Sequence, residues 1–505
     1  MTQTPDFGAG IAASSLGRGE MQTGTFDGAD ILLIRAEDGT LRAVSATCTH
    51  LGAPLETGAL IEGEIRCPWH HARFSLEDGQ AVGGPATESL GCYEVEESDG
   101  TIRVTGRRHV SAPRPALEVA TPVVIVGSGA AGYALADMLA RDGHGADTIL
   151  VSADEEAPYD RTFLSKQYLA GDAERSEVML PATGQGLGDP VDIRTGAKVT
   201  AIDTKAGTLR FEDGSSLDYG TLVLATGAEP VAPDFLGRDD PRVHTLRTLA
   251  DADALLAQAH EGKRATVLGA SFIGLEVAAS LVQRGLKVDV VAQGEVPLAP
   301  VLGERAGRHI QSLHEAHGVT FHMGRSLTSF EDEAVWLDDG TRLPADLLVL
   351  GTGVRPRLEL ARDAGLALAE DDDGIAVDGN LRTSAPAIYA IGDIASYPDP
   401  RLERPLRIEH WVHAQRQGGY LARLFTGASD ERFGDTPFFW TGYYGTQLRY
   451  VGHASPDDAR LEGDLDEGTF ALFYREEGKD RAMLSSGRDK EALATEAKWD
   501  TASHA

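Results

Sequence analysis

The chain has 505 residues, 42% of them hydrophobic and 25% charged, which is ordinary for globular protein and predicts about three or four domains. Its 46 basic and 78 acidic side chains give a formal charge of −32 without a basic stripe, which argues against nucleic acid and membrane partners. Because there is no run of about 18 apolar residues and no signal-peptide pattern, we expect a cytoplasmic protein.

Residues 1–108 predict an all-β domain. Short alternating runs such as ADILLIRA and TIRVTG are separated by DG, EG and SDG turn signals. The Pro- and Ala-rich segment 109–120 is typical of a linker.

The pattern then changes to strand, glycine turn and apolar-periodic helix, first in PVVIVGSGAAGYALADMLARDG and again from Arg264 in RATVLGASFIGLEVAASLVQRG. Two such openings predict two doubly wound α/β nucleotide-binding domains. We assign residues 121–240 and 357–434 to the first and residues 241–356 to the second, and expect a small α+β domain over residues 435–505.

Two short loops carry a possible metal site. Cys48 and His50 form C-x-H, and after sixteen intervening residues Cys67 and His70 form C-x₂-H. Two cysteines and two histidines suit either zinc or a Rieske [2Fe–2S] cluster. Zinc fingers usually pair like ligands at close spacing, whereas here each loop has one of each. The contexts CTHLGAPL and CPWHHARF resemble the Rieske family, which implies that these four residues hold the cluster.

The same resemblance gives three further expectations. High-potential Rieske proteins join the two loops by a disulfide, but Ala53 and Trp69 stand at those positions, so we expect a potential toward the lower end of about −150 to +300 mV. His71 stands where relatives often have Gly, and we expect its side chain to point away from the cluster, either at the surface or behind the ligand residues, near the rim of the cluster site. Cys92 is expected to be a small buried hydrophobe.

The first glycine loop, between a strand and a helix, predicts dinucleotide binding. Together with TLVLATGAEP, LLVLGTGVRP and TSAPAIYAIGDIA it resembles the pyridine-nucleotide-dependent flavoprotein reductases, which implies FAD with Asp393 on the ribityl chain. PYDRTFLSKQYLAG resembles a segment of oxygenase-coupled ferredoxin reductases and apoptosis-inducing-factor-like proteins, which implies that Lys166 lies near flavin N5. Because Ala153 replaces the usual ribose-binding acid, we expect Asp154 to take that role. The expected FAD ligands are Gly127, Gly129, Ala131, Gly132, Asp154, Arg161, Lys166, Val199, Arg247 and Asp393.

The second loop repeats this unit and predicts the nicotinamide cofactor. By resemblance Glu276 helps to place the nicotinamide, and we predict a Lys166–Glu276 ion pair as the catalytic pair at the flavin. The strand ends at Ala292 and Gln293 without Lys or Arg for a 2′-phosphate, which favours NADH and leaves NADPH open. RIEHWVHAQRQGG and FFWTGYYG supply aromatic residues expected beside the flavin and nicotinamide. The expected ligands here are Gly269, Ser271, Ile273, Gly274, Glu276, Gly353, Glu409, His410, Trp411 and Trp440.

In module order the chain resembles the Rieske-fused apoptosis-inducing-factor-like reductases. The resemblance implies hydride transfer from NAD(P)H to FAD, then single electrons to the cluster and to an external acceptor such as an oxygenase or cytochrome. No cysteine follows Cys92, which excludes the C-x₄-C chemistry of disulfide reductases. An NAD(P)H oxidase or quinone reductase, and a redox-sensing interaction protein, are the alternatives. The acidic surface favours an acceptor with a basic docking face, and the chain is expected to be a monomer or homodimer.

Overall fold

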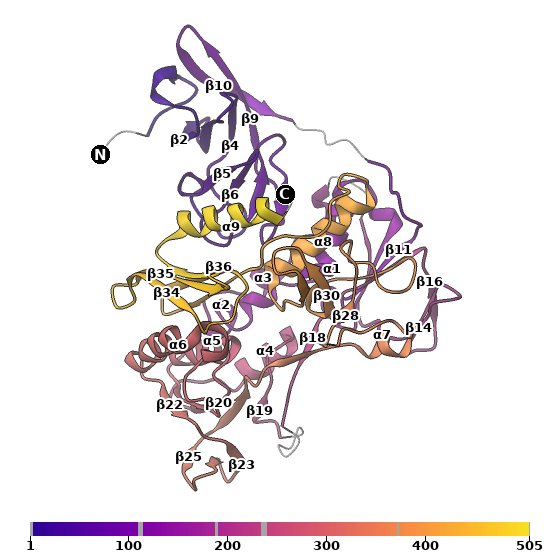
Figure 1. Cartoon of the computed structure of the whole chain (residues 1–505), viewed down its shortest axis with the longest axis vertical. Helices are drawn as coiled ribbons and strands as arrows, with labels where there is room; N and C mark the ends of the chain where they lie inside the picture. Colours follow the sequence, from indigo (N-terminus) through magenta and orange to yellow (C-terminus); the bar gives the residue numbers. More distant parts are fainter. Residues whose placement is uncertain (1–3, 110–114, 187–189, 234–239, 371–372, 504–505) are drawn as a thin grey trace.

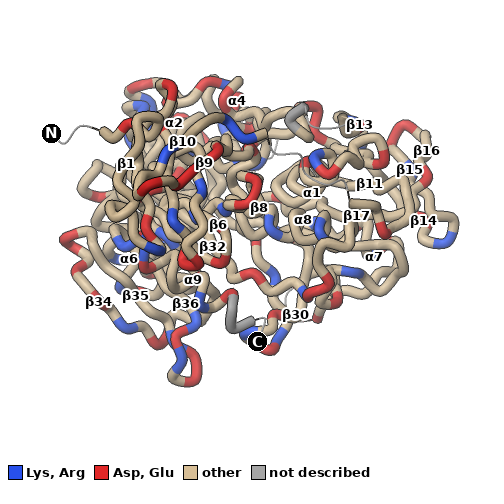
Figure 2. Tube along the Cα trace, turned by 90° about the horizontal axis from the view of Figure 1, so that it is seen from above, with Lys and Arg blue, Asp and Glu red and all other residues tan. Residues whose placement is uncertain are grey.

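The computed structural model describes residues 4–109, 115–186, 190–233, 240–370 and 373–503, so part of the predicted 109–120 linker lies outside the described residues. The chain forms four structural units, and the first α/β unit is built from two chain segments that lie before and after the second α/β unit in the sequence (Figure 1). Acidic residues occur along nearly all of the trace rather than in one segment (Figure 2). Within the described ranges, no helix is both long and apolar enough to cross a membrane.

The N-terminal unit is all-β, as predicted. It consists of a six-stranded antiparallel sheet and a four-stranded antiparallel sheet, and its buried core includes the two loop cysteines, Cys48 and Cys67, and Cys92. Cys92 is only 5% exposed, which confirms its expected burial. In sheet order the strands are β1 (Ile11–Ala12), β10 (Thr101–Arg108), β9 (Cys92–Ser98), β4 (Leu41–Ser45), β3 (Ala29–Arg35) and β2 (Glu20–Phe26), then β5 (Ala59–Ile61), β6 (Glu64–Arg66), β7 (Arg73–Ser75) and β8 (Ala81–Gly83).

The first nucleotide-binding unit is a five-stranded parallel sheet with helices packed on it. Its central strand VVIV is buried at all four positions, because strands covered on both faces are apolar throughout. The sheet order is β13 (Asp192–Arg194), β12 (Thr148–Val151), β11 (Val123–Val126), β17 (Thr221–Leu224) and β29 (Ile388–Ala390), and helices α1 (Ala130–Arg141) and α8 (Trp411–Phe425) pack together beside it. A three-stranded sheet of β14 (Val199–Asp203), β15 (Thr208–Phe211) and β16 (Ser216–Asp218) is attached.

The second nucleotide-binding unit repeats this architecture. Its parallel sheet has the order β19 (Val243–His244), β26 (Leu347–Leu350), β20 (Arg264–Leu268), β21 (Lys287–Ala292) and β22 (Thr320–Met323). The accompanying helices are α4 (Leu249–Leu256), α5 (Phe272–Gln283) and α6 (Ala299–Ala316), with a small sheet of β23 (Leu327–Glu331), β24 (Ala334–Leu337) and β25 (Arg342–Pro344). The two doubly wound units confirm the predicted fold class.

The C-terminal unit joins the others together. Its antiparallel sheet has the order β32 (Phe438–Tyr443), β33 (Thr446–Gly452), β36 (Lys479–Ser486), β35 (Thr469–Glu476) and β34 (Ala459–Asp464). The final helix α9 (Asp489–Ser503) lies between this sheet and the N-terminal unit (Figure 1) and contacts β5, β33 and β36. The N-terminal unit is therefore docked on the rest of the chain, a point on which the sequence makes no prediction.

Candidate redox site

The predicted metal ligands lie on two loops that meet at one end of the N-terminal unit. Cys48 and His50 follow strand β4, and Cys67 and His70 follow strand β6. Both cysteines are buried, and their side chains hydrogen-bond to each other. The Nδ1 atoms of His50 and His70 lie 3.1 Å apart. The structure thus brings the two thiols together and the two imidazoles together.

This pairing by type fits a two-iron cluster better than a single ion. Within the described ranges, no three His, Cys, Asp or Glu side chains form a group that could hold one metal ion. Two nitrogens bound to one metal at ~2.1 Å lie roughly 3 Å apart, close to the observed histidine separation. Burial lowers the pKa of His50 to about 4, and burial together with His50 also lowers the pKa of His70. Both rings are therefore neutral, as ligation requires.

His71 does not lie at the surface or the rim. It is fully buried, stacks on Phe438 with ring centroids 3.9 Å apart, and pairs with Glu496 of α9. Its φ of +57° lies in the left-handed region that favours glycine, and this turn directs its side chain away from His70. The surface alternative is therefore wrong, because α9 covers this loop, and the alternative of a side chain behind the ligand residues agrees with the structure.

Other polar contacts fix the same loop on the C-terminal unit. Arg449 of β33 donates from Nε to the carbonyl oxygens of Pro68 and Trp69, at 3.1 and 2.9 Å, and pairs with Asp489 at 2.9 Å. Arg66 pairs with Asp500 at 2.8 Å. These contacts join segments that are far apart in the sequence, and neither the glycine pattern nor the charge pattern of the sequence predicts them.

A groove for the first dinucleotide runs over the carboxyl ends of the parallel strands of the first α/β unit. It comprises one cavity of about 750 Å³ and an adjoining one of about 180 Å³. A Cβ at Gly127 would lie 2.1 Å from the Ala225 oxygen, and one at Gly132 would lie 1.9 Å from the Gly127 oxygen, so both positions require glycine. Gly132 thereby serves helix–strand packing rather than lining the groove. The other predicted FAD residues that line it are Gly127, Gly129, Ala131, Asp154, Arg161, Lys166, Val199, Arg247 and Asp393.

The inner end of this groove carries the predicted catalytic pair. Lys166 Nζ lies 2.9 Å from Glu276 Oε2, so the predicted ion pair is present. Glu276 is 5% exposed and also accepts hydrogen bonds from Ser165 at 2.5 Å and Thr441 at 2.7 Å. The carboxylate thus contacts Lys166 and the hydroxyls of Ser165 and Thr441. The sequence analysis did not predict the two hydroxyl contacts, because neither residue belongs to a recognised motif. Arg247 and Asp393, predicted separately, pair with each other at 2.9 Å.

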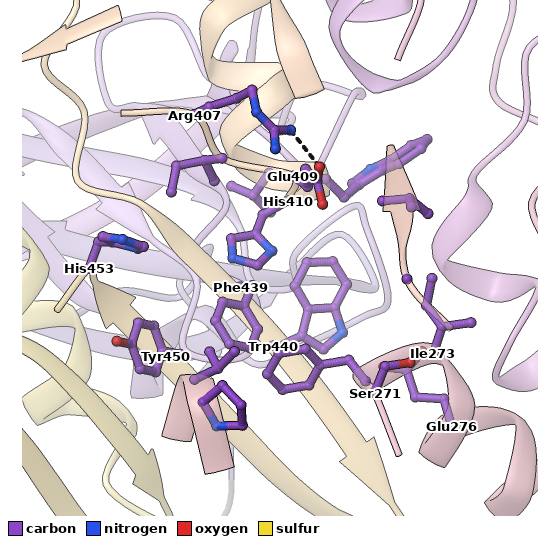
Figure 3. A pocket seen from close by; sticks show the side chains of 18 of the residues that line it. Ser271, Ile273, Glu276, Arg407, Glu409, His410, Phe439, Trp440, Tyr450 and His453 are labelled. Carbon is purple, nitrogen blue, oxygen red and sulfur yellow. Dashed lines mark hydrogen bonds and ion pairs between the residues drawn. The ribbon is translucent and has the colours of Figure 1, made fainter. Parts of the chain in front are cut away.

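A second groove meets the first at Glu276. Its cavities, of about 710 and 610 Å³, share Ser271, Phe272 and Gly353. Ser271 replaces the middle glycine of the motif, where its hydroxyl accepts from Gly274 N and donates to Gly351 O, so it caps α5. Gly274 packs against Gly269 and Gly351 instead of lining the groove. The remaining predicted residues that line it are Gly269, Ile273, Glu276, Gly353, Glu409, His410, Trp411 and Trp440, several of which appear in Figure 3.

Trp440 lies between this groove and the cluster loops. Its ring centroid is 4.4 Å from that of His70 and 6.3 Å from that of His50. The same side chain lines the cavity that holds Ser271 and Glu276 (Figure 3). The His410 ring packs against Phe439 in a tilted arrangement, with ring centroids 4.2 Å apart, and burial lowers its pKa to about 3, so it is neutral. The sequence predicted Trp440 beside the nicotinamide but not its contact with a cluster ligand.

These features define a class of protein: a redox enzyme with two dinucleotide grooves that meet at a buried Lys–Glu pair, next to a site for a two-iron cluster. Residues 121–418 match the family model described as pyridine nucleotide-disulphide oxidoreductase, and residues 9–94 match that of the Rieske [2Fe-2S] domain. The chain belongs to the pyridine nucleotide-disulphide oxidoreductase family and carries a fused Rieske domain.

Similar proteins have both parts or the reductase part alone. The chain is 33% identical to apoptosis-inducing factor 3 of Mus musculus, over 94% of this chain and 80% of that protein. It is 36% identical to the anthranilate 1,2-dioxygenase system ferredoxin–NAD(+) reductase component of Burkholderia cepacia, over 70% of this chain and 87% of that protein. The crystal structure of the covalent putidaredoxin reductase–putidaredoxin complex matches with a TM-score of 0.70 and 32% identity, over 75% of this chain and 93% of that chain.

The predicted recognition, enzyme class and cofactors are thereby confirmed. The chain is an NAD(P)H oxidoreductase that uses FAD and a Rieske [2Fe–2S] cluster in electron transfer. FAD and the cluster, when bound, supply two-electron and one-electron redox chemistry respectively. The family name refers to disulphides, but the chain has no cysteine after Cys92 and so no thiol pair at the flavin end of the groove.

Proposed function

We propose that this chain carries electrons from NADH to an external redox acceptor, with its own Rieske domain as the internal relay. The observation that carries the proposal is the position of Trp440, whose ring lies 4.4 Å from His70 and lines the groove that also holds Glu276. One aromatic side chain thus separates the two cofactor sites. This arrangement favours electron transfer within one chain over transfer to a separate ferredoxin.

The roles of the groove residues follow from their charges. Lys166 supplies a cation where negative charge develops as the flavin is reduced, and Glu276 holds the Lys166 ammonium in place. Arg247 and Asp393 hold the flavin's ribityl chain and neighbouring groups. Cys48, His50, Cys67 and His70 hold the cluster, with the two imidazoles facing Trp440.

The adenosine end of the second groove supports NADH rather than NADPH. Among the described residues, those that line this cavity include no Asp, Glu, Lys, Arg or His, and the strand-end residue is Gln293. A 2′-phosphate would therefore find no cation among these described lining residues.

We also propose the kind of acceptor surface, the cellular compartment and the oligomeric state. The formal charge of −32 favours an acceptor with a basic docking face. With Cys48 and Cys67 as cluster ligands, Cys92 is the one other cysteine of the sequence and forms no disulfide, which agrees with a reducing compartment such as the cytoplasm. A monomer suffices for the chemistry, because both grooves and the cluster loops come from one chain, and a homodimer is equally compatible with it.

An anaerobic NADH titration of the reconstituted protein, followed by optical and EPR spectroscopy, tests the proposal. We expect flavin reduction and the reduced-Rieske EPR signal to appear in stoichiometric amounts. Flavin reduction with a cluster that stays oxidised would refute internal relay. Slow flavin reduction with a persistent flavin–nicotinamide charge-transfer band would instead favour the redox-sensor alternative.

A further inference from the structure

A third cavity reaches the Lys166–Glu276 pair from a side that neither dinucleotide groove uses. It has a volume of about 390 Å³ and is bounded by helices α2 (Gln167–Ala170) and α5, by strands β32 and β33 and by the two cluster loops. Lys166 and Glu276 line this cavity, and they also line the FAD groove and the NADH groove. The ion pair is therefore the wall between the meeting point of the two grooves and the third cavity.

The outer end of this cavity is open to solvent. Leu51 and Trp69, which belong to the two cluster loops, line it and are 37% and 38% exposed. Asp172, just after α2, and Gln447 of β33 line it from the other sides and are also exposed. The cavity thus extends from solvent to the carboxylate of Glu276, which is only 5% exposed.

The walls of the cavity are suited to hold water. They include polar side chains from several elements, namely Gln167, Asp172, Ser280, Gln283, Tyr443, Tyr444 and Gln447. The hydroxyl oxygen of Tyr443 is buried and has no hydrogen-bond partner in the part of the chain that the structure describes. Buried hydroxyls are usually hydrogen-bonded, and a polar cavity of this size has room for several water molecules. Water in the cavity therefore supplies the partner that the Tyr443 hydroxyl needs.

Tyr443 belongs to the inner end of the cavity. It lies two residues after Thr441 on β32, so both side chains point to the same face of the sheet. The Thr441 hydroxyl donates to Oε1 of Glu276 at 2.7 Å. Burial and the nearby Glu276 carboxylate raise the pKa of Tyr443, so its phenol stays protonated. A neutral hydroxyl beside Glu276 can accept one hydrogen bond and donate another, as a group that positions water for proton transfer must.

The reaction leaves a proton at this inner end. NADH gives up a hydride, which is two electrons and one proton, whereas the cluster passes single electrons to the acceptor. One NADH and two oxidised one-electron acceptors thus give NAD⁺, one proton and two reduced acceptors. During this transfer the two grooves are filled by the dinucleotides, so the proton needs another way out.

We propose that the third cavity is the proton exit of the enzyme, with Tyr443 as the residue that positions its water. Glu276 takes the proton at the inner end and gives it to water in the cavity, and Asp172 lies at the solvent end. In each step one O–H bond breaks as the next one forms, and no further oxidant or reductant takes part. The proposal rests on the proposed function, because the transfer of single electrons is what leaves the proton behind.

The kinetics of proton release test the proposal. The holoenzyme is reduced with one equivalent of NADH, kept in excess NAD⁺, and mixed with ferricyanide in weakly buffered solution that contains a pH indicator. We expect about one proton per flavin, released in the same phase as flavin reoxidation. Tyr443→Phe should lower the ratio of the proton-release rate to the flavin-reduction rate at least about tenfold, since the ring stays and only the hydroxyl is lost.

Tyr474→Phe is the matched control. Tyr474 is a buried tyrosine on β35 of the same sheet, its hydroxyl donates to Leu302 O at 2.9 Å, and it does not line the cavity. Its substitution should change the ratio of the two rates by less than about twofold. An unchanged ratio in Tyr443→Phe would overturn the proposal. So would slower proton release by the native protein as NAD⁺ is raised, because the proton would then leave through the NADH groove.

A high-resolution crystal structure of the oxidised holoenzyme with NAD⁺ gives a test without turnover. We expect an ordered water molecule within hydrogen-bond distance of the Tyr443 hydroxyl and further waters from there to Asp172. In Tyr443→Phe this water should be lost while the Lys166–Glu276 pair remains. A cavity without bound water would overturn the proposal. This outcome is separate from failure of the internal relay, which would appear as a cluster that stays oxidised in the NADH titration.

Discussion

Replacing Glu496 should loosen the N-terminal unit from the C-terminal helix. Glu496 is fully buried and pairs with His71 and with Arg416, whose Nη2 lies 2.6 Å from Oε1. Burial by itself would raise the pKa of this carboxyl, but Arg416 and His71 hold the pKa well below its usual range. Glu496 is therefore the charged partner of two groups on different units.

The size of the effect follows from what Glu496→Gln leaves behind. Breaking a buried ion pair costs ~3–5 kcal/mol, because the remaining charge stays buried without its partner. Arg416 retains the nearby carboxylate of Asp435, so we take the lower value of about 3 kcal/mol. Local opening of the interface should then be about 100-fold more populated.

Hydrogen–deuterium exchange measures this opening directly. The amides of Cys67 and His71 bond to Ala72 O and Cys67 O within the cluster loop, at 2.8 and 3.2 Å. In Glu496→Gln, peptides that cover this loop should exchange up to about 100-fold faster. Glu491→Gln on the same helix removes only a partly exposed pair with Arg488 and should change exchange by less than about threefold. Equal protection in Glu496→Gln and the native chain would refute the role assigned to this pair.

Three further predictions concern the cofactor sites. His70→Ala should abolish the [2Fe–2S] cluster, whereas His71→Ala should retain about one cluster per chain, as measured by iron and sulfide analysis. Loss of the cluster in both variants would contradict the ligand assignment. Trp440→Ala should slow reduction of the cluster at least about tenfold in stopped-flow experiments, while NADH still reduces the flavin, because the substitution removes the ring that packs against His70. Equal slowing of flavin reduction and cluster reduction would contradict this role. Gln293→Arg should raise kcat/KM for NADPH by about 10- to 100-fold, because the new guanidinium would pair with the 2′-phosphate. An unchanged ratio of kcat/KM for NADPH to that for NADH would mean that the adenosine binds elsewhere.

Local sequence patterns predicted much of the fold and of the site. The two glycine loops identified both α/β units, because a Cβ would collide with the backbone at Gly127 and Gly132 of the first loop and at Gly269 and Gly274 of the second. At these positions the backbone geometry requires glycine, so the residue type indicates the geometry. The spacing of Cys48, His50, Cys67 and His70 indicated a metal site, and the resemblance of the two loops to the Rieske family favoured a [2Fe–2S] cluster over zinc. The Lys166–Glu276 pair came from resemblance to a family, and its two hydroxyl partners were missed because no motif includes Ser165 or Thr441.

By itself the sequence determined which cofactors the chain is built for, because their contacts depend on short segments with fixed residue types. Only the tertiary structure decided how the cofactor sites are joined. His71 and Glu496 are 425 residues apart in the chain, and no periodicity or spacing relates them. Their contact requires α9 to pack against both the C-terminal sheet and the N-terminal unit, and this packing holds His70 against Trp440. Long-range packing, rather than any local motif, thus places the FAD groove, the NADH groove and the cluster loops next to one another.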